Sequence, residues 1–393
     1  MRIAYVCADR GVPIFGCKGC SIHVQEVVRA LRQHGHQVTI FAARLGGTAP
    51  EDLADVPVQR LPKAPKYDLA QREQVEIAAN LDLRLALELG GPFDLVYERY
   101  SLWSFSAMVY AQDYQIPGVL EVNAPLLLEQ AQYRQLIHTQ QAQVIARRVF
   151  AAASTLVAVS QDVADYLASF SQTQGRVAVV PNGVNPMRFH PSQSGLQHSL
   201  HQPFTVGFVG TMKDWHGLPV LTQAFMQFYR QYSQARLLMV GDGPARPAMQ
   251  ATLEQCGLGE AVTWSGRVPP EQIPAWLAMM DVAVAPYPLL ESFYFSPLKV
   301  YEYMAAGLPV VASDVGQLRH IIQSEANGLL CAAGDADALT AQLQRLHAQP
   351  HLRLRLGQAA RKTVLACHSW MQRVAHILEL ARMGALTARR EVS

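Results

Sequence analysis

The stretch from Ala285 to Gly316 carries residue types that can bind a phosphate group. A helix is expected over Leu298–Ala306, and Pro297 stands at its start, because proline tolerates the first helical position, where its missing N–H costs nothing. The amides of Leu298 and Lys299 would then point out of the helix start, which attracts anions, and the Lys299 ammonium adds a positive charge. Glu302 follows on the same helix face. This pattern suits a nucleotide diphosphate, with amides for the phosphates and a carboxylate for the ribose, although many such helix starts bind nothing.

A second candidate phosphate site follows the predicted strand Thr205–Val209. The loop Gly210–Gly217 and a predicted helix from Leu218 to Tyr229 come next. A glycine loop between a strand and a helix brings backbone N–H groups close to a phosphate. Lys213 in this loop is the candidate cation, and the alternative is a lysine that is merely solvated. Gly241-Asp242-Gly243-Pro244 further along indicates, from its chemistry alone, only a turn.

Polar side chains also end two predicted strands in the first half of the chain. Glu98 and Arg99 follow one apolar run, and Glu121 and Asn123 close another. In sheets of parallel strands, ligands collect at the carboxyl ends of the strands, so these side chains are expected to face a cleft. The alternative for Glu121 is a buried ion pair with Arg99.

The loop from Gly11 to Gly19 follows the first predicted strand. Gly16 and Gly19 would allow the backbone to approach a bound ligand, and the alternative is a simple tight turn. His23 lies early in the following helix, where a single histidine is more often structural than catalytic.

The composition limits the class of protein. The chain has 393 residues, which predicts two or three domains, and its net charge of +2 gives no electrostatic reason to expect a nucleic-acid partner. No apolar run reaches the roughly 18 residues that span a bilayer, and the start does not resemble a signal peptide, so we expect a cytoplasmic protein. Cys17 and Cys20 form a C-x-x-C pair without a second ligand pair, which predicts no metal site and free cysteines.

The elements that must position these residues alternate between strand and helix through both halves, which predicts parallel sheets flanked by helices. The expected strands are Ile3–Ala8, Val38–Ala42, Leu95–Tyr97, Gly118–Val122, Leu156–Val159, Thr205–Val209, Leu237–Val240, Val262–Gly266, Val282–Ala285 and Pro309–Ala312. The expected helices include Ile22–Gln33, one long helix from about Leu127 to Phe150, Leu218–Tyr229 and Leu298–Ala306.

The run SPLKVYEYMAAGLPVVASDVG resembles the donor-binding segment of family 4 glycosyltransferases, and GTMKDWHG and GDGP resemble two further loops of that family. The resemblance covers nearly the whole chain and implies an α/β protein of GT-B fold, with two Rossmann-like parallel-sheet domains facing a central cleft. The expected domains are an acceptor-side domain (1–190), a linker (191–203), a donor domain (204–368) and a helix that crosses back to the first domain (369–393).

The resemblance also implies roles for single residues. Catalysis would use Lys213, Lys299, Asn123 and Glu121. The nucleotide sugar would be held by Gly16, Gly19, Gly210, Thr211, Lys213, Gly241, Arg267, Tyr294, Ser296, Leu298, Lys299 and Glu302.

Three departures from the family pattern stand out. Tyr294 occupies the position of the first of two usual glutamates, which meets the donor sugar, and Glu291 would replace it only if the loop bends differently. Asn123 stands where many members have a histidine. His216 stands where a lysine is more usual, so Lys299 is expected to compensate for the missing charge.

The resemblance implies a retaining, metal-independent glycosyltransferase that uses a UDP- or GDP-linked sugar and no separate cofactor, in glycan or polysaccharide biosynthesis. The acceptor would be a glycan, a lipid-linked sugar or a small molecule, and contact with the inner membrane surface stays open. Two alternatives remain. One is an epimerase or hydrolase of the same fold, which would consume the donor without an acceptor. The other is a non-catalytic nucleotide-sugar-binding scaffold.

Overall fold

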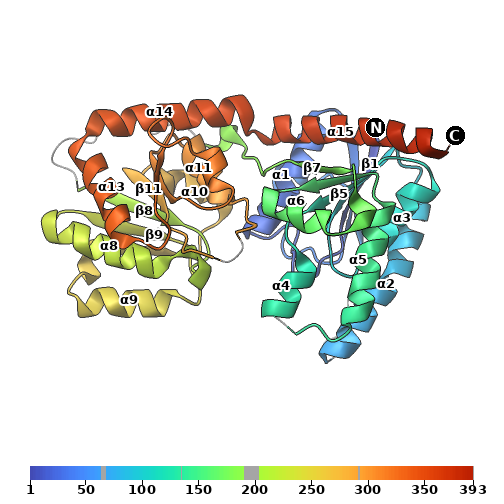
Figure 1. Ribbon diagram of the computed structural model, residues 1–393, viewed down its shortest axis with the longest axis horizontal. Helices are drawn as coiled ribbons and strands as arrows, with labels where there is room; N and C mark the ends of the chain where they lie inside the picture. The colour runs from blue at the N-terminus through green and yellow to red at the C-terminus, as the bar shows by residue number, and fades with distance from the viewer. Residues whose placement is uncertain (63–67, 134, 190–202, 291–292, 393) are drawn as a thin grey trace. The chain divides into compact units, whose positions relative to one another are not determined.

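The computed structural model describes residues 1–62, 68–133, 135–189, 203–290 and 293–392. The chain divides into two compact units, which we call the N-unit and the C-unit (Figure 1). The N-unit consists of Met1–Asn182 and Trp370–Ser393, and the C-unit is Gly183–Ser369. The first boundary therefore falls after Asn182, whereas the sequence placed it at residue 190. The predicted linker, 191–203, lies outside the described residues except for its last position.

The N-unit is built on a sheet of seven parallel strands in the order β3-β2-β1-β4-β5-β6-β7. Ile3 to Cys7 of the central strand are fully buried, as expected for a parallel strand that helices cover on both faces. The strands are β1 (Arg2–Cys7), β2 (Gln37–Ala42), β3 (Val58–Arg60), β4 (Leu95–Arg99), β5 (Gly118–Val122), β6 (Thr155–Ala158) and β7 (Val177–Val179). The helices are α1 (Gly19–Gln33), α2 (Leu69–Gly90), α3 (Ser106–Asp113), α4 (Leu126–Tyr133), α5 (Thr139–Ala152), α6 (Gln161–Ala168) and α15 (Trp370–Val392).

The C-unit holds a second sheet, of six parallel strands in the order β10-β9-β8-β11-β12-β13. Its strands are β8 (Thr205–Val209), β9 (Arg236–Val240), β10 (Val262–Gly266), β11 (Val282–Ala285), β12 (Val310–Ser313) and β13 (Leu329–Cys331). Its helices are α8 (Leu218–Gln231), α9 (Arg246–Gln255), α10 (Ile273–Leu277), α11 (Leu298–Ala305), α12 (Leu318–Ile321), α13 (Ala336–Ala348) and α14 (Pro350–Cys367). Two parallel sheets flanked by helices confirm the predicted α/β class.

The last helix returns to the N-unit. Helix α15 packs against α1 and β6 (Figure 1). Near its start, the Met371 carbonyl accepts a hydrogen bond of 2.9 Å from Nε2 of His34. The unit boundary falls between Ser369 and Trp370.

Two predictions about helices differ from the structure, apart from small shifts in the end residues of strands and helices. The long helix expected from Leu127 to Phe150 is wrong, because the chain forms α4 and α5 instead, with a break between Tyr133 and Thr139. Pro297 is not the first residue of α11 but its N-cap, with extended backbone (φ −75°, ψ 108°). The helix begins at Leu298, the first residue of the predicted run Leu298–Ala306, and Pro297 precedes it. No helix in the described part of the chain is long and apolar enough to cross a membrane.

Candidate functional site

The candidate phosphate-binding segments of the C-unit lie at its topological switch point. From β8 the chain moves to β9 and β10 on one side, and then returns to β11 on the other side of β8. The loop Gly210–Gly217 leaves the carboxyl end of β8, and the segment that leads to α11 leaves the carboxyl end of β11. Crevices at such points are where open α/β sheets bind ligands. Neighbouring strands thus bring together two segments that are far apart in the sequence.

Lys299 reaches from α11 to the first glycine of the β8 loop. A Cβ built on Gly210 would lie 3.1 Å from Lys299 Nζ, so the ammonium lies close to the space that a side chain at that position would fill. Nζ also lies 4.0 Å from the centre of the Phe208 ring and 5.5 Å from that of Tyr287. Nζ is buried and has no hydrogen-bond partner among the described residues. Burial lowers the pKa of Lys299 to about 7, and Glu302 only partly offsets this shift. The aromatic rings stabilise the cation without using its N–H donors, which have no acceptor among the described residues.

The other two basic residues of the β8 loop have different surroundings. Nδ1 of His216 donates a hydrogen bond of 2.6 Å to the Thr211 carbonyl. Burial, and then the charge of Lys299, lowers the pKa of His216 to about 3, so this imidazole is neutral at physiological pH. Lys213 is half-buried, with Nζ 5.3 Å from the Trp215 ring centre. The loop therefore supplies one positively charged side chain, Lys213, and Lys299 supplies a second positive charge.

Gly241, which was predicted to bind the nucleotide sugar, allows two adjacent loops to pack closely. It has a φ of +126°. A Cβ there would lie 2.1 Å from the Gly210 carbonyl oxygen, so no side chain fits. Its amide donates to the Gly266 carbonyl at 3.1 Å. The next predicted residue, Arg267, is 84% exposed and forms an ion pair of 3.8 Å with Asp242. Its side chain therefore lies in solvent.

The remaining predicted residues of the C-unit lie on or just before α11. Ser296 is buried, and its Oγ lies 3.5 Å from the Tyr301 hydroxyl. Tyr294 is half-buried, with its ring centre 4.4 Å from that of Phe295. Leu298 begins the helix, and Glu302 is half-buried one turn after it. Glu291, the proposed substitute for a sugar-binding glutamate, lies outside the described residues.

In the N-unit, Glu121 pairs with His23. Nε2 of His23 lies 2.8 Å from Oε2 of Glu121, and both side chains are 2% exposed. Because a carboxylate only accepts hydrogen bonds, Nε2 carries the proton. Burial alone would raise the pKa of Glu121, but His23, and then Arg99, holds it below the usual carboxyl value. The rings of Trp370 and His23 lie edge to face, with their centres 4.8 Å apart. The hydrogen-bonded partner is therefore His23, and Arg99 acts through its charge.

The other polar residues at this sheet edge are buried or half-buried. Glu98 accepts a hydrogen bond from Ser104 Oγ, and burial raises its pKa to about 7. Asn123 is half-buried, and its Nδ2 has no hydrogen-bond partner among the described residues. Gly16 would place a Cβ 2.9 Å from Pro13 Cγ, which favours the tight-turn interpretation, and Gly19 begins α1.

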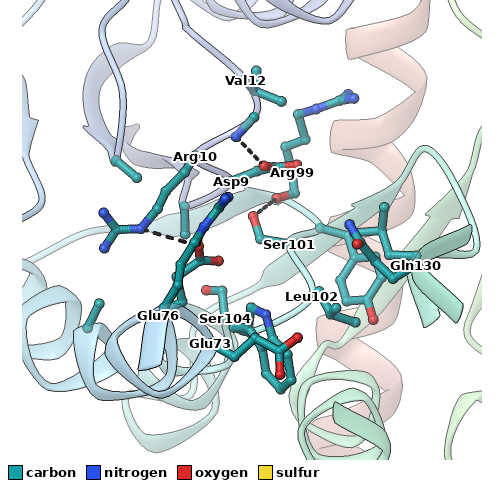
Figure 2. Close-up of a pocket in the computed structure, with 18 of the residues that line it drawn as sticks. Asp9, Arg10, Val12, Glu73, Glu76, Arg99, Ser101, Leu102, Ser104 and Gln130 are labelled. Carbon is teal, nitrogen blue, oxygen red and sulfur yellow. Dashed lines mark hydrogen bonds and ion pairs between the residues drawn. The ribbon is translucent and has the colours of Figure 1, made fainter. Parts of the chain in front are cut away.

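A pocket of about 440 Å³ opens at the switch point of the N-unit, between the carboxyl ends of β1 and β4. Most of its lining residues come from the β1 loop, α2, the loop after β4, and α4 with the loop that precedes it. Figure 2 shows Arg10 and Glu76, joined by an ion pair of 3.7 Å, at one side of this pocket and Gln130 at the other. Arg99 and Asn123 are among the lining residues.

Comparison with known proteins decides the family. Residues 18–188 match "Glycosyltransferase Family 4", and residues 203–349 match "Glycosyl transferases group 1". The chain belongs to the family 4 glycosyltransferases. It is 28% identical, over 369 residues, to the D-inositol 3-phosphate glycosyltransferase of Xylanimonas cellulosilytica, and the match covers 87% of this chain and 86% of that protein.

Solved structures show that this glycosyltransferase has the GT-B fold. Sucrose-phosphate synthase from Thermosynechococcus elongatus superposes with a TM-score of 0.75 at 23% identity, over 99% of both chains. The Anabaena protein HepE, in complex with UDP and glucose, superposes with a TM-score of 0.73 at 17% identity, over 96% of this chain and 98% of that one. The predicted fold and family are confirmed.

Sequence reasoning missed two features, one in each unit. It did not identify Phe208 and Tyr287 as the rings beside Lys299, and it assigned nothing to α2, whose Glu76 lines the pocket. The i,i+4 spacing of Arg72 and Glu76 was visible, but this spacing occurs on many solvated helices. No cluster of three or more His, Cys, Asp or Glu side chains in the described residues is placed to hold a metal ion. All six cysteines are free, as predicted.

We expect Gly217 to be indispensable to the β8 loop of the glycosyltransferase. Its φ is +67°, and a Cβ there would lie 1.6 Å from the Pro286 carbonyl oxygen. Gly257 has a similar φ of +73° but open space around it. Alanine in the left-handed backbone region lowers the stability by about 1–3 kcal/mol at either position. Gly217→Ala also makes the new Cβ overlap with the Pro286 carbonyl oxygen, whereas Gly257→Ala causes no overlap. Urea unfolding should therefore show a clearly larger loss for Gly217→Ala than for Gly257→Ala. Equal losses would contradict the close approach to Pro286.

Proposed function

We propose that this glycosyltransferase transfers a sugar from a nucleotide diphosphate to an acceptor hydroxyl, with retention of anomeric configuration and without a metal ion. The observation that carries the proposal is the position of Lys299. Its buried ammonium, which has no hydrogen-bond partner among the described residues, lies beside Gly210 at the switch point of the C-unit. A lysine whose ammonium has no hydrogen-bond acceptor among the described residues, and which lies beside a glycine loop, is suited to bind phosphate oxygens.

The C-unit offers complementary groups for the rest of the nucleotide. The amides of Ser296, Leu298 and Lys299 at the start of α11, together with Gly210, Thr211 and Lys213 in the β8 loop, are proposed to bind the diphosphate. Glu302 is proposed to accept hydrogen bonds from the ribose hydroxyls. The HepE structure, in which UDP is bound to a protein of the same fold, supports a uridine nucleotide as the first candidate, with a guanosine nucleotide as the second.

The proposed reaction needs little covalent chemistry from the protein. The bond between the anomeric carbon and the diphosphate oxygen breaks, and its electron pair leaves with the diphosphate. The acceptor oxygen bonds to the same carbon from the same face, and its proton passes to a phosphate oxygen of the departing group. Lys299, Lys213 and the helix-start amides stabilise the charge that develops on the diphosphate. Asn123 and Glu121 are proposed to orient the acceptor side, Glu121 through its bond to His23.

Ligand-induced thermal stabilisation tests the donor site. The purified protein is heated with UDP, GDP, ADP and the corresponding nucleotide glucoses and mannoses. A nucleotide at 100 times its dissociation constant should stabilise the fold by about 2.7 kcal/mol. Hydrogen bonds to a charged group contribute about 1.5–3 kcal/mol, so Glu302→Ala should weaken the binding at least about tenfold.

The matched control is Glu254→Ala, which removes an exposed glutamate from α9 in the same unit. It should leave the nucleotide affinity unchanged. The absence of stabilisation by all of these nucleotides would contradict the proposed donor site. Donor consumption without an acceptor, followed by mass spectrometry, would instead favour a hydrolase or epimerase.

A further inference from the structure

We propose that Cys17 and Cys20 form a reversible redox site, at which a low-molecular-weight disulfide converts the two thiols into a disulfide bond that moves the loop before α1. The pair lies at the start of this helix, with Lys18 as the N-cap and Gly19 as the first helical residue. Both cysteines are free thiols in the structure, which therefore shows the reduced form. The site is independent of the proposed sugar transfer.

The two cysteines are accessible and close together in the sequence. Cys17 is exposed and Cys20 is half-buried. Cys256 and Cys367 are exposed as well, but each lies far from any other cysteine in the sequence. A single exposed thiol exchanges with a small disulfide to give a mixed disulfide, whereas a neighbouring thiol can displace the small thiol and close an internal bond. Cys17 and Cys20 are the cysteines placed for this second step.

The two buried cysteines react poorly in comparison. Burial raises the pKa of Cys7 to about 12 and that of Cys331 to about 11, so almost no thiolate is present at either position near neutral pH. The thiolate is the form that attacks a disulfide. Cys7 is nevertheless within electrostatic range of Cys20, so a bond between these two is the alternative that the experiment must distinguish.

The segment that carries the pair is weakly held at its centre. No side chain caps the start of α1, and the backbone of Lys18 is extended, with φ −78° and ψ 157°. Among the described residues, the amides of Cys17 and Lys18 donate no backbone hydrogen bond. A helix start without a side-chain cap is less firmly fixed than a capped one. The backbone between the two cysteines can therefore change its conformation at a small cost.

Closing the disulfide requires such a change. The Cα atoms of a disulfide lie about 4.4–6.8 Å apart. One turn of helix brings Cα atoms three residues apart to about 5 Å, whereas an extended residue between them lengthens the separation. We therefore expect Lys18 to turn toward the helical region when the bond forms. Cys17 then moves toward Cys20, and the loop before it moves with it.

Gln25, in the second turn of α1, opposes this movement. Its Nε2 donates to the Ile14 carbonyl at 2.9 Å and to the Gly16 carbonyl at 3.0 Å. Because Gly16 directly precedes Cys17, its bond to Gln25 is the first that the movement must lengthen. The reduced form is thus stabilised by hydrogen bonds, and oxidation breaks at least one of them.

The exchange takes place in two steps that balance. The Cys17 thiolate attacks one sulfur of the small disulfide, a mixed disulfide forms, and one small thiolate leaves and takes up a proton. The Cys20 thiolate then attacks Cys17 Sγ, and the second small thiolate leaves in the same way. Two protein thiols are oxidised to one disulfide, while the small disulfide is reduced to two thiols. No acidic residue lies in the first turn of α1 to repel an anionic disulfide such as that of glutathione.

The experiment uses the full chain and glutathione. The protein is equilibrated at neutral pH with increasing glutathione disulfide at a fixed concentration of reduced glutathione, blocked with iodoacetamide and digested with trypsin. Trypsin cuts after Lys18, so the internal disulfide appears in mass spectrometry as peptide 11–18 linked to peptide 19–29. We expect this linked pair to form before any other cysteine is oxidised, and dithiothreitol to reverse it. Hydrogen exchange over residues 11–18 should be faster in the oxidised protein.

Variants of the pair separate the two steps. Cys17→Ser should abolish the linked peptides, and Cys20→Ser should stop the reaction at a mixed disulfide on Cys17. Cys256→Ser removes an exposed cysteine from the C-unit and should leave the linked pair unchanged.

The Gln25 bonds provide an independent readout. Gln25→Ala should let the disulfide form at about fivefold less glutathione disulfide, the equivalent of one hydrogen bond. Gln33→Ala is the control, because Gln33 is exposed on the same helix, and it should leave the midpoint unchanged.

Several outcomes would overturn the proposal. One is a link between peptides 3–10 and 19–29, which would assign the bond to Cys7 and Cys20. Others are a mixed disulfide that persists on Cys17 in the unmodified protein, oxidation of Cys256 or Cys367 before the pair, and thiols that stay reduced at every glutathione ratio. A linked pair that forms with unchanged hydrogen exchange, and at the same midpoint in Gln25→Ala, would contradict the expected movement of the loop.

Discussion

Lys299→Met is expected to lower kcat/KM for sugar transfer about 10²–10³-fold, the usual loss when one preorganised group that stabilises transition-state charge is removed. Methionine keeps the length and the contacts with Phe208 and Tyr287 but lacks the cation. The fold should survive, because a buried lysine without a hydrogen-bond partner among the described residues contributes little to stability. Steady-state kinetics with the nucleotide sugar that stabilises the protein would measure the effect.

The pH profile provides an independent readout. Burial lowers the pKa of Lys299 to about 7, so the ammonium is present below this pH and is lost as the pH rises through it. The value of kcat/KM reports the free enzyme, so it should fall above about pH 7, and this limb should be absent in Lys299→Met. A bound diphosphate favours the charged lysine, so kcat should fall only at higher pH.

Lys213→Met is the comparison variant for this prediction. Lys213 is half-buried and its Nζ lies against Trp215. Because solvent screens it more, we expect a smaller loss than for Lys299→Met. A larger loss for Lys213→Met, or an unchanged pH profile in Lys299→Met, would assign the leading electrostatic role to the β8 loop instead.

Glu121→Leu is expected to destabilise the N-unit by about 3–5 kcal/mol, because it removes the carboxylate that pairs with buried His23 and offsets the charge of Arg99. For a unit of this size, such a loss lowers the melting temperature by roughly 6–20 °C. Differential scanning calorimetry at pH 7 would measure it. Because the pKa of Glu121 is depressed in the folded protein, its contribution is present at neutral pH and is lost as the pH falls below the usual carboxyl range.

The variant Glu121→Gln tests the charge of this side chain separately from its shape. The amide fits the same space but lacks the negative charge that faces His23 and Arg99, so we expect a smaller loss of stability and a melting temperature that depends less on acid pH. Equal stability of Glu121→Leu and the unmodified protein would show that the His23–Glu121 bond stabilises nothing.

The sequence alone determined the fold class and most strand positions. Gly118–Val122, Thr205–Val209, Val262–Gly266 and Val282–Ala285 were predicted with the bounds that the structure shows. Strands of a parallel sheet are buried on both faces, so each reads as a short apolar run that local inspection finds. The start of α11 was predicted to within one residue, since Pro297 marks it.

The sequence predicted the boundaries of helices less well where the neighbouring segments are polar. The Gln-rich residues between Leu127 and Phe150 favour a helix throughout, and nothing in the local pattern signals the break between α4 and α5. At His138 the chain is held by tertiary contacts, because Glu73 on α2 accepts bonds from its amide at 2.9 Å and from its Nδ1 at 2.8 Å. Such a partner, distant in the sequence, overrides helix propensity.

Only the tertiary structure decided which residues come together in the candidate sites. The sequence singled out Lys299, Gly210 and Glu121 separately, but only the strand order places Lys299 Nζ against Gly210, and only the packing of α1 on the sheet brings His23 to Glu121. The pocket wall on α2 was not foreseen, because Glu76 meets Arg10 only in the folded unit. Local periodicity reports which side of an element is buried, whereas these contacts depend on which elements become neighbours.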